Sequence, residues 1–235
     1  TIRKLLKEGL KFDQMGNLCL YEGMWGEDFH YFLFDISFIE ELKESSRNDR
    51  EITSYSLGNT SNKLYGMLSV APDDISGNCN GAGIVNYARA KNGWGPTMYD
   101  IAMGLQPNGI ISDRSSVSRE AWDLWSFYHK KREDIEKSPL DHYEYGWTSN
   151  PEDDCQPGAD GDYLPPKWYY GYKKREAFLE DPLSWSYNRG PVPDMNVIRK
   201  NYELFDAMID ENDIRLPNDF WEKVSRGFFD RGSEY

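Results

Sequence analysis

The sequence contains few of the side chains that bind transition metals or form disulfide frameworks. It has three histidines and three cysteines among 235 residues. Cys19, Cys79 and Cys155 are far apart and form no C-x-x-C pair, and no two histidines form an H-x-x-x-H pair. This spacing argues against a zinc site and against a disulfide framework, and we expect three free thiols. Free thiols are typical of a protein made in a reducing compartment, or of a particle assembled in one.

Basic residues and long apolar runs are also scarce. The chain has 27 Lys and Arg against 40 Asp and Glu, a net charge of −13, and no basic stripe, which argues against direct binding to nucleic acid. No apolar run approaches the roughly 18 residues that a transmembrane helix needs. The first segment, TIRKLLKEGLKF, is too short and too charged for a signal peptide and is typical of an amphipathic helix. With 39% hydrophobic and 15% aromatic residues, the sequence predicts a soluble globular protein.

The sequence does contain an alternation of strand-like and helix-like segments. Strands are predicted where β-branched and aromatic residues gather between turn residues, at 17–25, 30–37, 63–71, 81–90 and 108–113. Helices are predicted from apolar residues at helical spacing, at 38–46, 96–105 and 116–134, with Ser118 as an N-cap. This order indicates an α/β (α+β) protein with a single mixed sheet.

The composition changes near residue 140. Residues 1–139 are predicted to form the α/β domain, and residues 140–235 an aromatic-rich extension that either packs on that domain or forms a unit of its own. The extension is predicted to hold a loop, a strand in KWYYGY and two amphipathic helices within 193–212 and 217–229. The aromatic faces of these helices are either additional core or a surface for other proteins of a larger complex, including further copies of the chain.

A glycine-rich turn, Asn92-Gly93-Trp94-Gly95, connects a predicted strand to a predicted helix. The free N–H groups and the dipole at a helix start can bind an anion without Lys or Arg. The turn is not a Walker loop, because no Gly-Lys-Ser/Thr follows, and Met98 stands where a dinucleotide fingerprint has its third glycine. On its own the turn is either a structural corner or an anion site.

Between Lys63 and about Arg132, the chain resembles the GNAT superfamily of N-acetyltransferases. The segment Ala90-Lys91-Asn92-Gly93-Trp94-Gly95 follows that family's Q/R-x-x-G-x-G/A turn, with Ala90 in place of the Gln or basic residue. Ser118-x-x-Ala121-x-x-Leu124-Trp125 matches the spacing of its N-x-x-A-x-x-L-Y helix. The resemblance implies a mostly antiparallel sheet flanked by helices, and acetyl-CoA as cofactor. It implies that the pantetheine arm pairs with Val85, Asn86, Tyr87 and Ala88. It implies that the pyrophosphate contacts Asn92, Gly93, Trp94, Gly95 and Thr97.

The resemblance also suggests catalytic residues. In that family the tyrosine of the helix motif often protonates the departing thiolate. Trp125 occupies this place and does not titrate usefully, so the thiolate is predicted to take its proton from Tyr128, one turn later, or from water; Tyr128 is otherwise a packing residue. Asp113 is the predicted general base and Asp35 is a second candidate, although both also suit turns or caps.

A looser resemblance concerns where the protein acts. The segments GWGPTMYDIAM and GIISDRSSVSREAWDLWSFYHKKR are similar to acetyltransferase-like proteins encoded by bacteriophages, some of which are carried in virions. That resemblance implies the cytoplasm of a host cell or a virion as the location. Two hypotheses follow: an N-acetyltransferase that uses acetyl-CoA, and a non-catalytic structural or interaction protein of a virion with the same fold.

Overall fold

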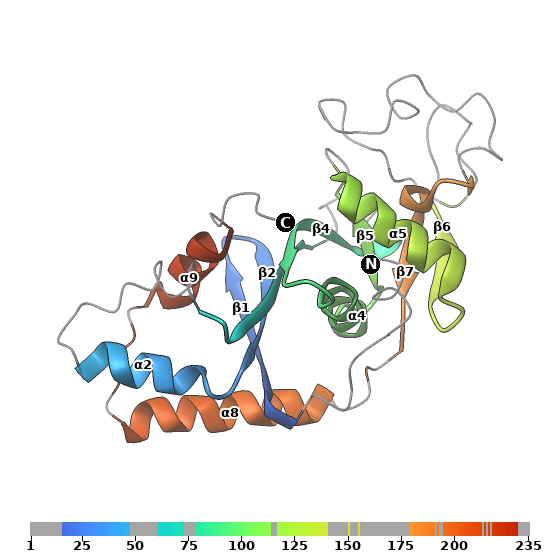
Figure 1. Ribbon diagram of the computed structural model, residues 1–235. Helices are drawn as coiled ribbons and strands as arrows, with labels where there is room; N and C mark the ends of the chain where they lie inside the picture. The colour runs from blue at the N-terminus through green and yellow to red at the C-terminus, as the bar shows by residue number, and fades with distance from the viewer. Residues whose placement is uncertain are drawn as a thin grey trace.

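One seven-stranded sheet organises the fold (Figure 1). The computed structural model describes residues 16–47, 61–72, 79–113, 117–140, 150, 155, 179–190, 192, 195–212, 214, 216 and 218–229. The strands are β1 (Leu18–Trp25), β2 (Asp28–Asp35), β3 (Leu64–Ala71), β4 (Gly83–Ala90), β5 (Ile110–Ser112), β6 (Glu136–Pro139) and β7 (Trp185–Asn188). Their order is β1-β2-β3-β4-β5-β7-β6, in which β4 and β5 are parallel and the other neighbours antiparallel.

Five α-helices accompany this sheet in the described part of the chain. They are α2 (Phe38–Arg47), α4 (Gly95–Leu105), α5 (Arg119–Lys131), α8 (Met195–Glu211) and α9 (Phe220–Phe229). The predicted mixed, mostly antiparallel sheet flanked by helices is therefore confirmed. The predicted N-cap is present as well, because the Ser118 hydroxyl accepts the Ala121 N–H at 3.2 Å. The helix predicted in the first twelve residues and the strand predicted in KWYYGY lie outside the described residues.

Strands β6 and β7 were not predicted, and each has only four residues. The β6 segment, EKSP, is polar and ends in a proline, so it has no strand-like pattern. Strand β7 lies between β5 and β6, where Tyr187 pairs with Ile110 on one side and Lys137 on the other. Pairing between segments so far apart in the sequence cannot be read from local periodicity.

Helices cover both faces of the sheet (Figure 1). Along β2, Tyr31 and Leu33 belong to the core that includes α4 and α5, whereas Phe32 and Phe34 belong to the core that includes α2, α8 and α9. All four side chains are at most 4% exposed. Because alternate residues of a strand point to opposite faces, a strand buried on both sides is apolar throughout.

The aromatic residues of the C-terminal helices contribute to the second of these cores. The Phe34 ring lies 4.9 Å from the Phe205 ring of α8 and 5.1 Å from the Trp221 ring of α9, between centroids. Phe220 and Phe228 are buried in the same cluster. These aromatic side chains therefore form additional core within the chain, one of the two roles predicted for them.

The expectation of three free thiols is wrong, because Cys79 and Cys155 form a disulfide. Both residues are buried in a small apolar cluster that includes Ile111 and Leu140. Cys19 is free and buried. The paired cysteines are 76 residues apart, and their proximity depends on the tertiary arrangement of distant segments, which cysteine spacing does not reveal.

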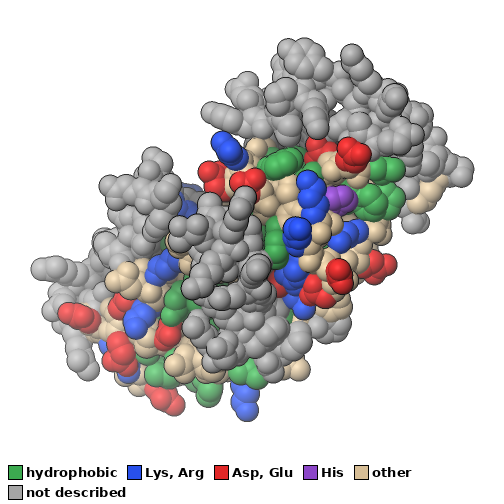
Figure 2. All heavy atoms as spheres, turned by 45° about the vertical axis from the view of Figure 1, so that its right-hand side comes forward, with side chains coloured by type: hydrophobic (Ala, Val, Ile, Leu, Met, Phe, Trp, Pro, Cys, Tyr) green, Lys and Arg blue, Asp and Glu red, His purple; other side chains and the backbone are tan. Residues whose placement is uncertain are grey.

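Among the described residues, no helix combines the length and the apolar character that crossing a membrane requires. On the face shown in Figure 2, acidic and basic side chains lie close to one another.

Candidate active site

Strand β4 makes a short parallel pairing with the whole of β5 and continues beyond its end. The pairing runs from Gly83 opposite Ile110 to Val85 opposite Ser112. Beyond Val85, the edge of β4 that faces β5 has no strand partner among the described residues.

A β-bulge in β4 lies directly after the last β4 residue that pairs with β5. Ser69 of β3 pairs with Tyr87, whereas its neighbour Val70 pairs with Val85, so Asn86 is the additional residue on β4. A bulge bends a strand and increases its twist. The bulge at Asn86 therefore bends β4 just beyond its last residue paired with β5.

The turn after β4 is anchored in the core by Trp94. The Trp94 ring is buried and stacks on Tyr65, with 4.5 Å between ring centroids. The Lys91 N–H donates to the Tyr65 carbonyl at 2.8 Å. Gly93 has a φ of 86°, a left-handed conformation that favours glycine. The turn is therefore a defined structural corner.

The start of α4 also presents backbone donors. The first hydrogen bond of the helix joins the Met98 N–H to the Trp94 carbonyl at 3.1 Å, so the N–H groups of Gly95 and Thr97 precede the ladder. Pro96 has no N–H to contribute. A Cβ added to Gly95 would meet no atom within 4 Å, so the space beside it is open. The same turn is thus both a corner and a candidate anion site.

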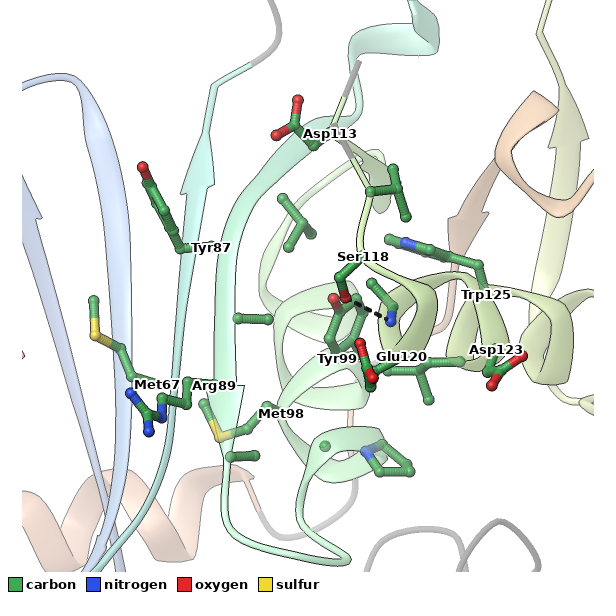
Figure 3. A pocket seen from close by; sticks show the side chains of 18 of the residues that line it. Met67, Tyr87, Arg89, Met98, Tyr99, Asp113, Ser118, Glu120, Asp123 and Trp125 are labelled. Carbon is green, nitrogen blue, oxygen red and sulfur yellow. Dashed lines mark hydrogen bonds between the residues drawn. The ribbon is translucent and has the colours of Figure 1, made fainter. Parts of the chain in front are cut away.

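A cavity of about 510 Å³ lies between β4, this turn and the first turns of α5 (Figure 3). Most of the residues that sequence reasoning singled out line it: Val85, Asn86, Tyr87, Ala88, Asn92, Gly93, Gly95 and Asp113. Trp94 and Thr97 are buried and do not belong to the lining, and neither does Tyr128. The structure therefore brings the strand, the turn and Asp113 together around one space.

Several lining residues were not among those singled out, including Met67, Arg89, Met98 and Tyr99. In Figure 3, Tyr87 and Arg89 point to one side of β4, while Met98 and Tyr99 lie on the other side. Strand alternation from Tyr87 could have identified Arg89. Met67 could not have been found in this way, because its place opposite Arg89 depends on the register between β3 and β4.

The two predicted bases lie in different places. Asp113 follows β5 and lines the cavity. Asp35 ends β2 and does not belong to the lining; it accepts the Ser37 N–H at 2.8 Å and lies 3.4 Å from the Tyr65 hydroxyl that donates to it. Asp35 therefore has the turn role that its residue type favours.

Tyr128 lies behind the cavity wall, where it joins α5 to α4. Its side chain is fully buried, and its hydroxyl lies 2.8 Å from the Pro96 carbonyl and 3.0 Å from Oδ1 of Asp100. Burial raises the pKa of Tyr128 well above its ordinary value, and the nearby Asp100 raises it further. The hydroxyl proton is therefore held between two acceptors inside the protein and is not directed toward the cavity.

Asp100 is the centre of a buried ionic network beneath the cavity. Arg132 donates to both of its carboxylate oxygens at 3.1 Å, and Arg189, which follows β7, donates to Oδ2 at 2.9 Å. Arg132 also donates to Asp134 at 2.7 Å. Burial raises the pKa of Asp100, whereas the two guanidinium groups oppose that shift and favour the ionised form. The network holds α4 in place relative to the end of α5 and to β7.

The chain has no match among protein-family models, curated proteins or solved structures. Its chemistry is therefore inferred from the cavity. The lining carries Asp113, Glu120 and Asp123 together with Arg89 and Lys91, so neither sign of charge dominates strongly. No cluster of His, Cys, Asp and Glu among the described residues could hold a metal ion. The features that distinguish the cavity are thus the part of β4 beyond the end of β5 and the neutral N–H group of Gly95 at the start of α4.

Proposed function

We propose that the cavity binds an acyl-CoA, acetyl-CoA foremost, and that the chain transfers the acyl group to an amine. One observation carries the proposal. The part of β4 that continues beyond the end of β5 leads directly into the glycine turn and the start of α4, and all three line a single cavity. This continuity suits a ligand that has an extended, amide-containing arm at one end and a diphosphate at the other.

Each part of such a ligand has a complementary element. The pantetheine arm is extended and carries amide groups, so it can hydrogen-bond to the β4 edge between Asn86 and Ala90 as an added strand would. The pyrophosphate suits the N–H group of Gly95, which lines the cavity, and the positive end of the α4 dipole. The resemblance to the GNAT superfamily supports the same placement.

The chemistry requires few protein groups. A backbone N–H of the bulged strand near Asn86 can donate to the thioester carbonyl oxygen and stabilise the charge that develops there. The amine nitrogen attacks the carbonyl carbon, a C–N bond forms and the C–S bond breaks. Asp113 accepts the proton that the nitrogen loses, and water protonates the thiolate, because the Tyr128 hydroxyl is engaged behind the wall.

Calorimetry with acetyl-CoA tests the proposal. Gly95→Glu places a carboxylate in the open space at the start of α4 and should weaken binding at least about tenfold through charge repulsion and occupancy of the site. Gly16→Glu is the matched control, since a Cβ at Gly16 also meets no atom within 4 Å and the residue does not line the cavity. No binding of the unaltered protein at millimolar acetyl-CoA would contradict the proposal.

A structural or interaction role in a virion is the competing proposal. It is supported by Val197 and Leu204, which are 42% and 50% exposed on α8 and lie two helical turns apart. Under this proposal the purified protein would not bind acetyl-CoA, and the Gly95→Glu variant would assemble with its partners as the unaltered protein does.

A further inference from the structure

Three polar side chains from adjacent strands meet beside the bulge in β4. Oδ2 of Asp28, at the start of β2, accepts a hydrogen bond from the Ser69 hydroxyl of β3 at 3.0 Å. The same oxygen accepts a hydrogen bond from the Asn86 amide of β4 at 3.1 Å. Ser69 is 1% exposed. One carboxylate oxygen therefore joins β2, β3 and β4, and we call this group the Asp28 clamp.

The position of the clamp coincides with two irregularities of the sheet. Asn86 is the additional residue that shifts the register between β3 and β4. It also follows Val85, the last β4 residue that pairs with β5. Asp28 is itself placed by the turn between β1 and β2, where it pairs with Trp25. The clamp therefore holds the one residue of β4 that has no register partner in either β3 or β5.

Such a contact stabilises the conformation of a bulged residue. A bulged residue leaves the ladder locally disrupted, so its conformation depends on contacts outside the ladder. A carboxylate that accepts hydrogen bonds from neutral donors provides a stronger contact than an uncharged acceptor would. Without it, the buried Ser69 hydroxyl and the Asn86 amide would both lose their acceptor.

We infer that Asp28 is a positioning residue that acts through Asn86. By fixing the bulge, it sets the direction in which β4, from Tyr87 to Ala90, continues beyond the end of β5 along the cavity. The inference rests on the proposed function, because this edge is where the acyl-CoA arm would bind. Its structural half, the dependence of β4 on Asp28, stands apart from any ligand.

Hydrogen exchange tests the structural half without a ligand. In Asp28→Ala, the amides of residues 86–90 should exchange about tenfold faster, while those of α5 keep their rates, since the change is local to β4. Glu27→Ala is the control, because Glu27 is an exposed carboxylate in the same turn, and its removal should leave β4 unchanged. Unchanged exchange in β4, or an equal increase in α5, would overturn the inference.

Acetyl-CoA affinity tests the functional half. Asp28→Ala and Asn86→Ala should each weaken binding about fivefold, and the double variant no more than either alone, because both remove the same contact. Asp28→Asn, which keeps an acceptor oxygen, should bind within about twofold of the unaltered protein. If the affinity losses of Asp28→Ala and Asn86→Ala multiply in the double variant, the positioning role of Asp28 is overturned. If the unaltered protein binds no acetyl-CoA, the proposed function fails, and the exchange experiment still decides the dependence of β4 on Asp28.

Discussion

Removing the Tyr128 hydroxyl separates a structural role of this residue from a catalytic one. In Tyr128→Phe the ring stays, and what is lost is the donor shared between the Pro96 carbonyl and Asp100. The ring packs near Tyr99, Trp125 and Tyr187, and these contacts do not involve the hydroxyl. The substitution therefore removes hydrogen bonding at a fully buried position without opening a large cavity.

The expected loss of stability can be estimated from the two acceptors of the Tyr128 hydroxyl, the Pro96 carbonyl and Asp100. A hydrogen bond to a charged group contributes about 1.5–3 kcal/mol. Asp100 keeps both of its arginine partners, so it is not left as an unpaired buried charge. We therefore expect the free energy of unfolding to fall by about 2 kcal/mol. For a chain of this size, that corresponds to a decrease in Tm of roughly 4–8 °C.

Urea denaturation and acyl transfer, measured on the same preparations, check this prediction. Tyr99→Phe is the matched control, because the structure shows no hydrogen bond from its hydroxyl to another described residue, and it should cost less than about 0.5 kcal/mol. Equal losses in the two variants would refute the structural role of the Tyr128 hydroxyl. Loss of transfer activity in Tyr128→Phe with unchanged stability would show that Tyr128 is the general acid after all.

Two further predictions concern the cysteines and the histidines. Without reductant, the denatured protein should react with an alkylating reagent only at Cys19, and three reactive thiols would contradict the disulfide. Because the Cys79–Cys155 disulfide joins residues 76 positions apart, its reduction should lower the free energy of unfolding by about 4 kcal/mol. Burial lowers the pKa of both His30 and His129, so the folded protein binds fewer protons than the unfolded chain. The contribution of these histidines to the free energy of unfolding should be fully present above about pH 6.5, the ordinary pKa of histidine, and should be lost as the pH falls through their pKa values in the folded protein. Urea titrations at pH 7.5 and 5.5 would detect this loss. A double His30→Gln, His129→Gln variant should lose this dependence.

Local patterns in the sequence predict much of the fold. The helix that begins after Ser118 follows from its N-cap and from Leu124, Trp125 and Tyr128 at helical spacing, and all three side chains are buried as that spacing requires. Strand composition likewise predicts β1 to β5. These elements can be predicted because the buried residues of each one lie close together in the sequence and follow a helix or strand pattern.

The parts that could not be predicted depend on pairing between distant segments. Strand β7 is identified by its pairing with β5 and β6, and not by a pattern in WSYN. The Cys79–Cys155 disulfide is likewise a long-range contact. At the site, the turn and the strand were found from their sequence. The acceptor role of Asp28 was not, because it needs the registers of three strands at once.

The way in which the turn is held bears on how an acidic protein could bind an anionic ligand. A net charge of −13 disfavours polyanions in general, so a site built from mobile lysines would compete with the field of the whole molecule. Here the donor that lines the cavity is the backbone N–H group of Gly95, and core contacts hold the turn in place. Trp94 stacks in the core on one side, and the Tyr128 hydroxyl donates to the Pro96 carbonyl on the other. A backbone N–H group held in this way loses little conformational entropy when a ligand binds, because no long side chain has to be ordered. The corner geometry is therefore the physical basis of the proposed anion site.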